Sequence, residues 1–141
     1  MSEYNNFNDN VITEFRANSG KVEGYFTNTP LLLLTTTGAK SGQTRIAPLA
    51  YITDEDRIII IASKAGAPTN PDWYHNLLAH PVATVEIGEE RFQVQATVAA
   101  EPERTRLYAK AAEQMSNFAE YERQTSRKIP VVALTRVKTA N

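Results

Sequence analysis

The feature that most constrains the fold is a succession of short β-type segments between residues 22 and 100. Turn residues separate candidate strands at 22–27, 30–37, 44–53, 57–64, 82–87 and 90–100, and a last strand is expected at 131–136. Phe92–Val98 alternates apolar with polar residues, which predicts one wet face, whereas Ile58–Ile61 is apolar throughout and is expected inside the sheet. Short antiparallel strands bury their edges best by closing into a barrel. We therefore expect a mainly β fold with helices, in the α+β class.

A helical pattern precedes the strands. Phe7, Val11 and Phe15 recur every four residues, which predicts an amphipathic helix within residues 1–20, followed by a single barrel domain at 21–141. Docking on the core is the simplest role for this helix. Exchange between subunits of a homodimer and peripheral contact with a membrane surface are the alternatives.

Two further helical regions interrupt the β pattern. The first has Asn70 as a candidate N-cap with Pro71 and Asp72 in its first turn, and it is expected to end near Ala79. The second follows Pro102 and extends to about residue 127. Both are expected to pack around the barrel.

Composition excludes several kinds of chemistry. The chain has no cysteine, which rules out disulfides, thiolate nucleophiles and cysteine zinc sites. His75 and His80 would not share a helix face, so no metal site is expected. With 15 Lys and Arg against 16 Asp and Glu, the chain lacks the basic footprint of a nucleic-acid binder. Redox chemistry would need a bound organic cofactor. The polar start and the short apolar runs predict a cytoplasmic protein.

The loop after the second candidate strand collects groups that bind anions. Gly38 and Gly42 allow a bend that presents backbone N–H groups, and Lys40, Ser41 and Arg45 add two cations and a hydroxyl. The spacing is not that of a P-loop. A hairpin tip with solvated charges is the alternative.

A second polar segment ends an apolar strand. Ser63 and Lys64 lead through Gly66 to the first turn of the expected helix, a place where barrels often hold ligands. Lys64 could also extend into solvent, and Trp73 and Tyr74 could be core anchors rather than ligand contacts.

Three separated motifs occur in one order: TTTGAKSGQTR at 35–45, ASKAGAPTNPDWYHNL at 62–77, and His80-Pro81. Together they resemble the deazaflavin-dependent nitroreductase and quinone reductase family, over residues 30–137. The resemblance implies a split β-barrel of the FMN-binding split-barrel type that binds coenzyme F420, a deazaflavin with a phosphodiester and an oligoglutamate tail. The anionic tail would account for Lys40, Arg45 and Lys64.

The resemblance also implies a set of cofactor-binding residues. They are Ala39, Lys40, Ser41, Arg45, Ile46, Ala47, Pro48, Leu49, Ala50, Ile61, Ala62, Ser63, Lys64, Asp72, Trp73, Tyr74, His75, Asn76 and Phe118.

The acceptor pocket is where the chain departs from the family. Relatives line it with tyrosines, whereas this chain has Met115 and Phe118 there and keeps Tyr121. The pocket is thus expected to be roomier and poorer in hydrogen-bond donors, unless Met115 and Phe118 serve only core packing. Ser63 and Tyr121 are the candidate catalytic groups, as donors to an oxyanion or a proton acceptor.

The resulting hypothesis is an F420H2-dependent oxidoreductase that transfers a hydride from the reduced deazaflavin to a quinone-like or nitro-aromatic acceptor. An FMN-binding split-barrel oxidoreductase and a non-enzymatic deazaflavin carrier are the alternatives. The expected partners are small molecules and no nucleic acid, for a monomer or a homodimer.

Overall fold

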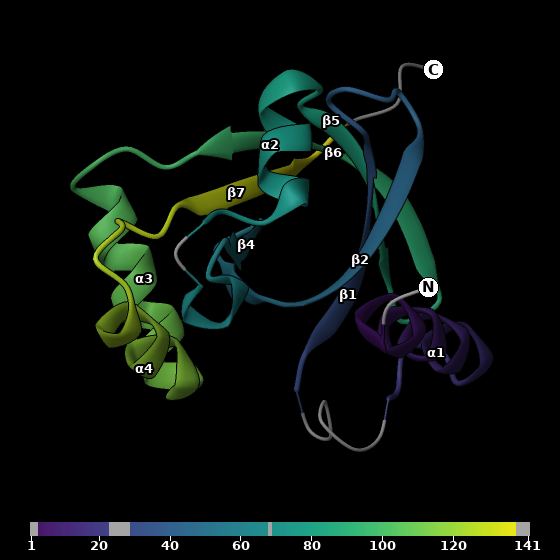
Figure 1. Ribbon diagram of the computed structural model, residues 1–141, viewed down its shortest axis with the longest axis horizontal. Helices are drawn as coiled ribbons and strands as arrows, with labels where there is room; N and C mark the ends of the chain where they lie inside the picture. The colour runs from purple at the N-terminus through teal and green to yellow at the C-terminus, as the bar shows by residue number, and fades with distance from the viewer. Residues whose placement is uncertain (1–2, 23–28, 68, 138–141) are drawn as a thin grey trace.

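Seven antiparallel strands form one curled sheet in the computed structural model, which describes residues 3–22, 29–67 and 69–137 (Figure 1). The strands are β1 (Leu31–Thr37), β2 (Thr44–Ala50), β3 (Ile52–Asp54), β4 (Arg57–Ile61), β5 (Val82–Ile87), β6 (Glu90–Val98) and β7 (Val131–Arg136). Their order in the sheet is β2-β1-β5-β6-β7-β4-β3. The expected α+β split barrel is confirmed. The expected strand at 22–27 lies largely outside the described residues.

The curl of the sheet follows from its two edge strands. β2 and β3 lie at opposite edges, yet Tyr51 alone separates them in the chain. The sheet must bend until its edges approach, since one residue cannot span a flat sheet of this width. The prediction of a single strand at 44–53 was therefore wrong. Its hydrophobic pattern runs across Tyr51, but Ile52 pairs with Ile59 of β4, far from the partners of β2.

Strands β1, β4 and β7 are covered on both faces, which explains their unbroken apolar runs. Leu32 and Leu34 point into the barrel core, whereas Leu31 and Leu33 pack in a separate outer cluster. Ile60 likewise belongs to the barrel core, whereas Ile59 and Ile61 belong to a second layer that packs against the helical region after Pro102. Side chains alternate across a strand, so such a run needs two hydrophobic layers.

Helix α1 (Glu3–Ala17) docks on the outer face of β1. Val11 and Phe15 are buried there, and the Arg16 guanidinium donates to both carboxylate oxygens of Glu86 at 3.1 and 2.9 Å. The barrel therefore covers the apolar face of the helix at Val11 and Phe15. Within the described ranges, no helix combines the length and apolarity needed to cross a membrane.

Between β4 and β5 the chain forms a 3₁₀ turn, η2 (Lys64–Gly66), and helix α2 (Asp72–Ala79). The strand expected to reach residue 64 ends at Ile61. The prediction that Asn70 caps α2 was wrong. Pro71 holds the N-cap position, and the Asn70 side-chain oxygen accepts a hydrogen bond from Arg127 instead, at 2.6 Å.

The helical region after Pro102 consists of α3 (Glu103–Gln114) and α4 (Asn117–Gln124), packed outside β4 and β7 (Figure 1). Met115, with an extended backbone, and Ser116 separate them. The Tyr108 hydroxyl donates to the Phe118 carbonyl oxygen at 2.6 Å, which ties α4 to α3. Burial raises the pKa of Tyr108 to about 12, so this donor keeps its proton.

A buried carboxylate joins α3 to the turn between β3 and β4. Asp54 accepts hydrogen bonds from Arg57 at 2.7 Å, from Arg106 at 3.1 and 3.2 Å, and from Lys110 at 3.0 Å. Arg57 also pairs with Glu103 at 2.7 Å. One acidic side chain thus connects two helical turns of α3 to the sheet.

Candidate functional site

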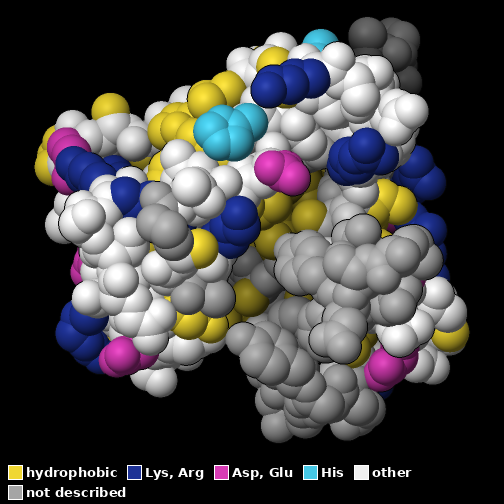
Figure 2. Space-filling model, viewed as in Figure 1, with side chains coloured by type: hydrophobic (Ala, Val, Ile, Leu, Met, Phe, Trp, Pro, Cys, Tyr) yellow, Lys and Arg dark blue, Asp and Glu magenta, His cyan; other side chains and the backbone are white. Residues whose placement is uncertain are grey.

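A cavity of about 1070 Å³ lies between β2, the loops that flank α2, and α4. Figure 2 shows it as a hollow with apolar side chains at its floor and Lys or Arg side chains on either side. The lining residues are Asn8, Thr36, Gly38, Ala39, Lys40, Ser41, Arg45, Ile46, Ala47, Pro48, Leu49, Ala50, Ile61, Ser63, Lys64, Pro71, Asp72, Trp73, His75, Asn76, Asn117, Phe118 and Tyr121. Most of the predicted site residues therefore meet in one place.

The loop between β1 and β2 uses most of its own backbone donors. The N–H of Gly38 donates to Gln43 at 2.7 Å, that of Gly42 to Gly38 at 2.9 Å, and that of Gln43 to the Ser41 hydroxyl at 3.1 Å. Gly42 has a φ of 71°, in the left-handed region, so the turn favours glycine there. These donors are not available to an anion. The cationic side chains of the loop must supply most of its attraction.

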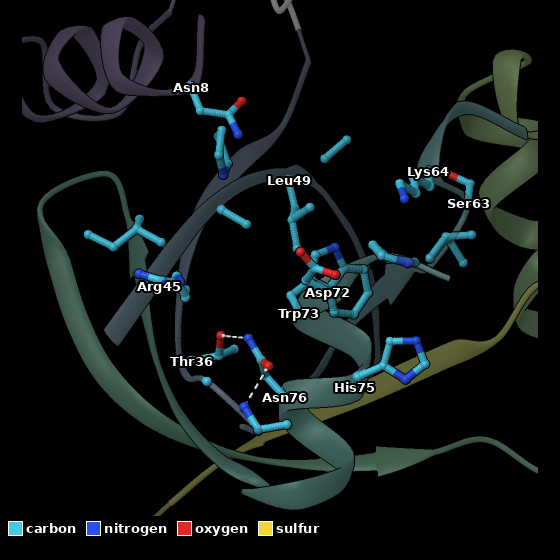
Figure 3. A pocket seen from close by; sticks show the side chains of 18 of the residues that line it. Asn8, Thr36, Arg45, Leu49, Ser63, Lys64, Asp72, Trp73, His75 and Asn76 are labelled. Atoms are coloured by element: carbon cyan, nitrogen blue, oxygen red, sulfur yellow. Dashed lines mark hydrogen bonds between the residues drawn. The ribbon is translucent and has the colours of Figure 1, made fainter. Parts of the chain in front are cut away.

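Asn76 fixes this loop to α2. Its side-chain nitrogen donates to Thr36 Oγ1 at 3.0 Å, and its oxygen accepts from the Ala39 N–H at 2.9 Å (Figure 3). The residue is buried, and both ends of its amide bind protein groups. Asn76 therefore sets where the loop lies against the cavity.

Among the described residues, three cations and one carboxylate line the cavity. Lys40 and Arg45 come from the β1–β2 loop and the start of β2, and Lys64 comes from η2. Figure 3 shows Arg45 and Lys64 on opposite sides of the cavity, with Asp72 between them. The lining thus has an excess of positive charge spread along its length, which suits a long anionic ligand.

Lys64 has an unusual backbone. Its φ is 47°, in the left-handed region that L side chains rarely adopt, and its ammonium donates to Thr69 Oγ1 at 3.3 Å. Ser63, next to it, is buried in the cavity wall. Strained backbone of this kind persists where the surroundings hold it, and it is common at functional sites.

Replacing Lys64 by Gly is expected to leave the protein more stable than replacing it by Ala, by about 1 kcal/mol. Both variants lose the ammonium, but only glycine adopts the left-handed conformation without a Cβ clash. Urea unfolding of the two variants measures the difference. Equal stabilities would contradict the strain at this position.

The far end of the cavity is built by α4. Phe118 is buried against Tyr108 and meets the ring of Tyr121 edge-on, with centroids 6.1 Å apart. The Asn117 amide donates to the Tyr121 hydroxyl at 3.3 Å. Phe118 therefore belongs both to the core and to the cavity wall.

Three predicted site residues lie outside the lining. Ala62 is in the barrel core, Met115 packs against the layer beneath α3 and α4, and Tyr74 borders a smaller hollow of about 270 Å³. Other lining residues escaped the sequence analysis. Asn117 adjoins a predicted residue, but Asn8 reaches the cavity from α1, and no local pattern indicates that.

The fold defines a split-barrel protein, and the cavity suits a flat ligand with an anionic tail. A family model described as F420H(2)-dependent quinone reductase matches residues 9–136. The chain belongs to the F420H(2)-dependent quinone reductase family. It is an oxidoreductase with F420 as its cofactor, as the resemblance implied.

Relatives and solved structures agree with this assignment. The F420H(2)-dependent quinone reductase Rv1261c of Mycobacterium tuberculosis is 46% identical over 110 residues, which are 76% of this chain and 74% of that protein. The structure of an F420-H2 dependent reductase, FDR-A, is 37% identical, with a TM-score of 0.68, over 74% of this chain and 93% of the other. A domain-swapped dimer is 34% identical, with a TM-score of 0.70, over 87% of this chain and 93% of the other.

Proposed function

We propose that this chain reduces quinones with F420H2 bound in the cavity described above. The observation that carries the proposal is the lining itself, whose described residues combine three cations and one carboxylate with an apolar floor. F420H2 supplies the hydride when it is bound, and the protein binds, orients and shields the reactants.

Lys40 and Arg45 are proposed to hold the anionic tail. Both are exposed at the same end of the cavity, where a phosphate or a carboxylate can reach them without the loss of an existing partner. Arg45 offers a planar fork for two parallel hydrogen bonds, and Lys40 offers a point charge. Asn76 keeps their loop in place through Thr36 and Ala39.

Ser63 and Tyr121 are proposed to serve the acceptor. Both residues line the cavity, Ser63 from the residue before η2 and Tyr121 from α4. A hydroxyl donor stabilises an oxygen on which negative charge develops, and it can pass a proton to the reduced product. Trp73 and Phe118 form apolar walls nearby, which exclude water from the reacting groups.

Helix α1 is proposed to act as part of the cavity wall. Asn8 lines the cavity, while Val11 and Phe15 are buried against the sheet. Because Val11 and Phe15 are buried, they are not available to contact a membrane surface.

A titration of the protein with F420, FMN and NADPH tests the cofactor. F420 is expected to bind most tightly, because its oligoglutamate tail adds charges that FMN lacks. Turnover is tested with F420H2 and a soluble quinone in the absence of oxygen. Tighter binding of FMN, or F420 binding without quinone reduction, would overturn the proposal.

Quinones are expected to be reduced faster than bicyclic nitroimidazoles. Phe118 offers no hydroxyl in the cavity wall, and Met115 lies outside it, so the Ser63 and Tyr121 hydroxyls are the proposed donors. The acceptor is then held mainly by stacking and apolar contact, and a nitroimidazole has few donors to orient it. Each missing neutral hydrogen bond is worth about 0.5–1.5 kcal/mol. Steady-state rates with F420H2 and either acceptor measure the preference.

A Phe118→Tyr variant sharpens this test. The added hydroxyl is expected to raise the nitroimidazole rate while the quinone rate changes little. Phe15→Tyr, which alters a buried phenylalanine outside the cavity, is the control. Nitroimidazole turnover equal to quinone turnover in the unmodified protein would contradict the acceptor preference.

A further inference from the structure

Arg127 makes three hydrogen bonds to one short segment. It lies between α4 and β7, yet its Nη2 donates to the Ser63 carbonyl at 2.8 Å and its Nε to the Ala67 carbonyl at 2.9 Å. Its Nη1 donates to the Asn70 side-chain oxygen at 2.6 Å. One guanidinium thus connects both ends of the turn that joins β4 to α2.

The acceptors are all neutral oxygens. Across residues 3–22, 29–67 and 69–137, no carboxylate forms an ion pair with Arg127, although its neighbours Arg123 and Lys128 each have one. Burial lowers the pKa of Arg127, but guanidinium groups remain charged at neutral pH. Three hydrogen bonds to neutral oxygens fix the position of the acceptors and do not neutralise the charge of Arg127.

The turn that Arg127 spans requires support. Lys64 has a φ of 47° and Gly66 a φ of 81°, so two of its residues are in the left-handed region. A Cβ on Gly66 would lie 2.5 Å from Gln124 Oε1, which shows how closely α4 packs on the turn. Ser63 and Lys64, at the start of this turn, line the cavity.

We propose that Arg127 is a positioning residue of the cofactor site. It holds Ser63, Ala67 and Asn70 so that the Ser63 hydroxyl and the Lys64 ammonium face the cavity, and it does not line the cavity itself. Lysine cannot replace it, because a single ammonium on a flexible stem cannot reach three acceptors arranged around a planar fork. The inference rests on the proposed function.

The test is a double-mutant cycle on the full chain, with F420 affinity measured by titration. Arg127→Lys is expected to weaken F420 binding about five- to thirty-fold, the effect of one misplaced charge-assisted hydrogen bond. In a Lys64→Ala background the further loss is expected to fall below about two-fold, because Arg127 acts through Lys64. In a Lys40→Ala background the full loss is expected to remain.

Arg123→Lys is the matched control, since Arg123 pairs with exposed Glu120 on α4 and does not line the cavity. Affinity of Arg127→Lys equal to that of the control would overturn the inference. So would a loss that is equally large with and without Lys64, which would indicate general destabilisation. Urea unfolding identifies a poorly folded variant, and Arg127→Gln then replaces it in the cycle.

Hydrogen exchange separates this inference from the proposed function. Amides of residues 64–67, 69 and 70 are expected to exchange faster in Arg127→Lys than in Arg123→Lys, without any ligand. If the unmodified protein fails to bind F420 but this difference appears, the proposed function fails and the role of Arg127 in the turn stands. Unchanged exchange in that segment would overturn the role of Arg127.

Discussion

Replacing Lys40 and Arg45 together by Ala is expected to weaken F420 binding by about 2–5 kcal/mol, roughly 30- to 5000-fold. Each side chain alone is expected to contribute about 1–3 kcal/mol. The loop keeps its shape in the variant, because Asn76 and the internal hydrogen bonds of Gly38 and Gly42 hold its backbone. The loss therefore reports the missing cations rather than a rearranged loop.

Salt distinguishes this effect from a loss of shape. Raising the ionic strength is expected to weaken F420 binding to the unmodified protein, and to weaken it less in the double variant, since two of the screened charges are gone. A variant with Lys21→Ala and Arg91→Ala is the control. It removes the same net charge from exposed positions outside the cavity. If the double variant at Lys40 and Arg45 binds F420 at low salt as tightly as this control does, these two residues do not hold the anionic tail.

Replacing Asp54 by Asn is expected to lower the free energy of unfolding by about 2–4 kcal/mol. The buried carboxylate accepts from Arg57, Arg106 and Lys110. The amide leaves Arg106 and Lys110 without this counter-charge, whereas Arg57 keeps Glu103. The loss stays below that of a fully buried pair, because the Arg106 side chain is 54% exposed and water screens it. Asp56→Asn, at an exposed position in the same turn, is the control.

The same carboxylate predicts a steep loss of stability in acid. Hydrogen bonds from Arg106, then from Arg57 and Lys110, hold the pKa of Asp54 well below its usual range. A depressed pKa stabilises the folded state above the pKa of the unfolded chain, about 3.9, and this contribution disappears as the pH falls toward the folded value. Lys128 and Thr105 similarly lower the pKa of Glu101, to about 2, so it titrates in the same window.

Urea unfolding at pH values from about 7 down to about 2 measures both effects. The free energy of unfolding is expected to fall more steeply below pH 4 in the unmodified protein than in Asp54→Asn. Two results would show that Asp54 does not anchor α3. One is an Asp54→Asn variant as stable as Asp56→Asn at pH 7, and the other is an equal fall of the unfolding free energy in acid for Asp54→Asn and the unmodified protein.

Patterns of neighbouring residues determined much of this fold. The strands at 82–87 and 131–136 begin and end where the sequence predicts them, because each carries its apolar pattern between clear turn residues. Ile59, Ile60 and Ile61 are buried, and β4 lies between β3 and β7 in the sheet, as the uniform hydrophobicity of 58–61 indicates. Most of the predicted cofactor residues line one cavity, since they lie in contiguous motifs that enter it together.

Tertiary contacts decided the rest. A hydrophobic pattern specifies which face of a strand is buried but not which edge of the sheet it joins, so nothing local shows that the chain changes edges at Tyr51. Asn70 has the chemistry of a helix cap, yet Arg127, 57 residues away, binds its side chain. Most backbone N–H groups of the 38–42 loop donate within the loop or to Asn76. Such polar groups have several compatible partners along the chain, and only the packed structure selects which of them lie within hydrogen-bond distance.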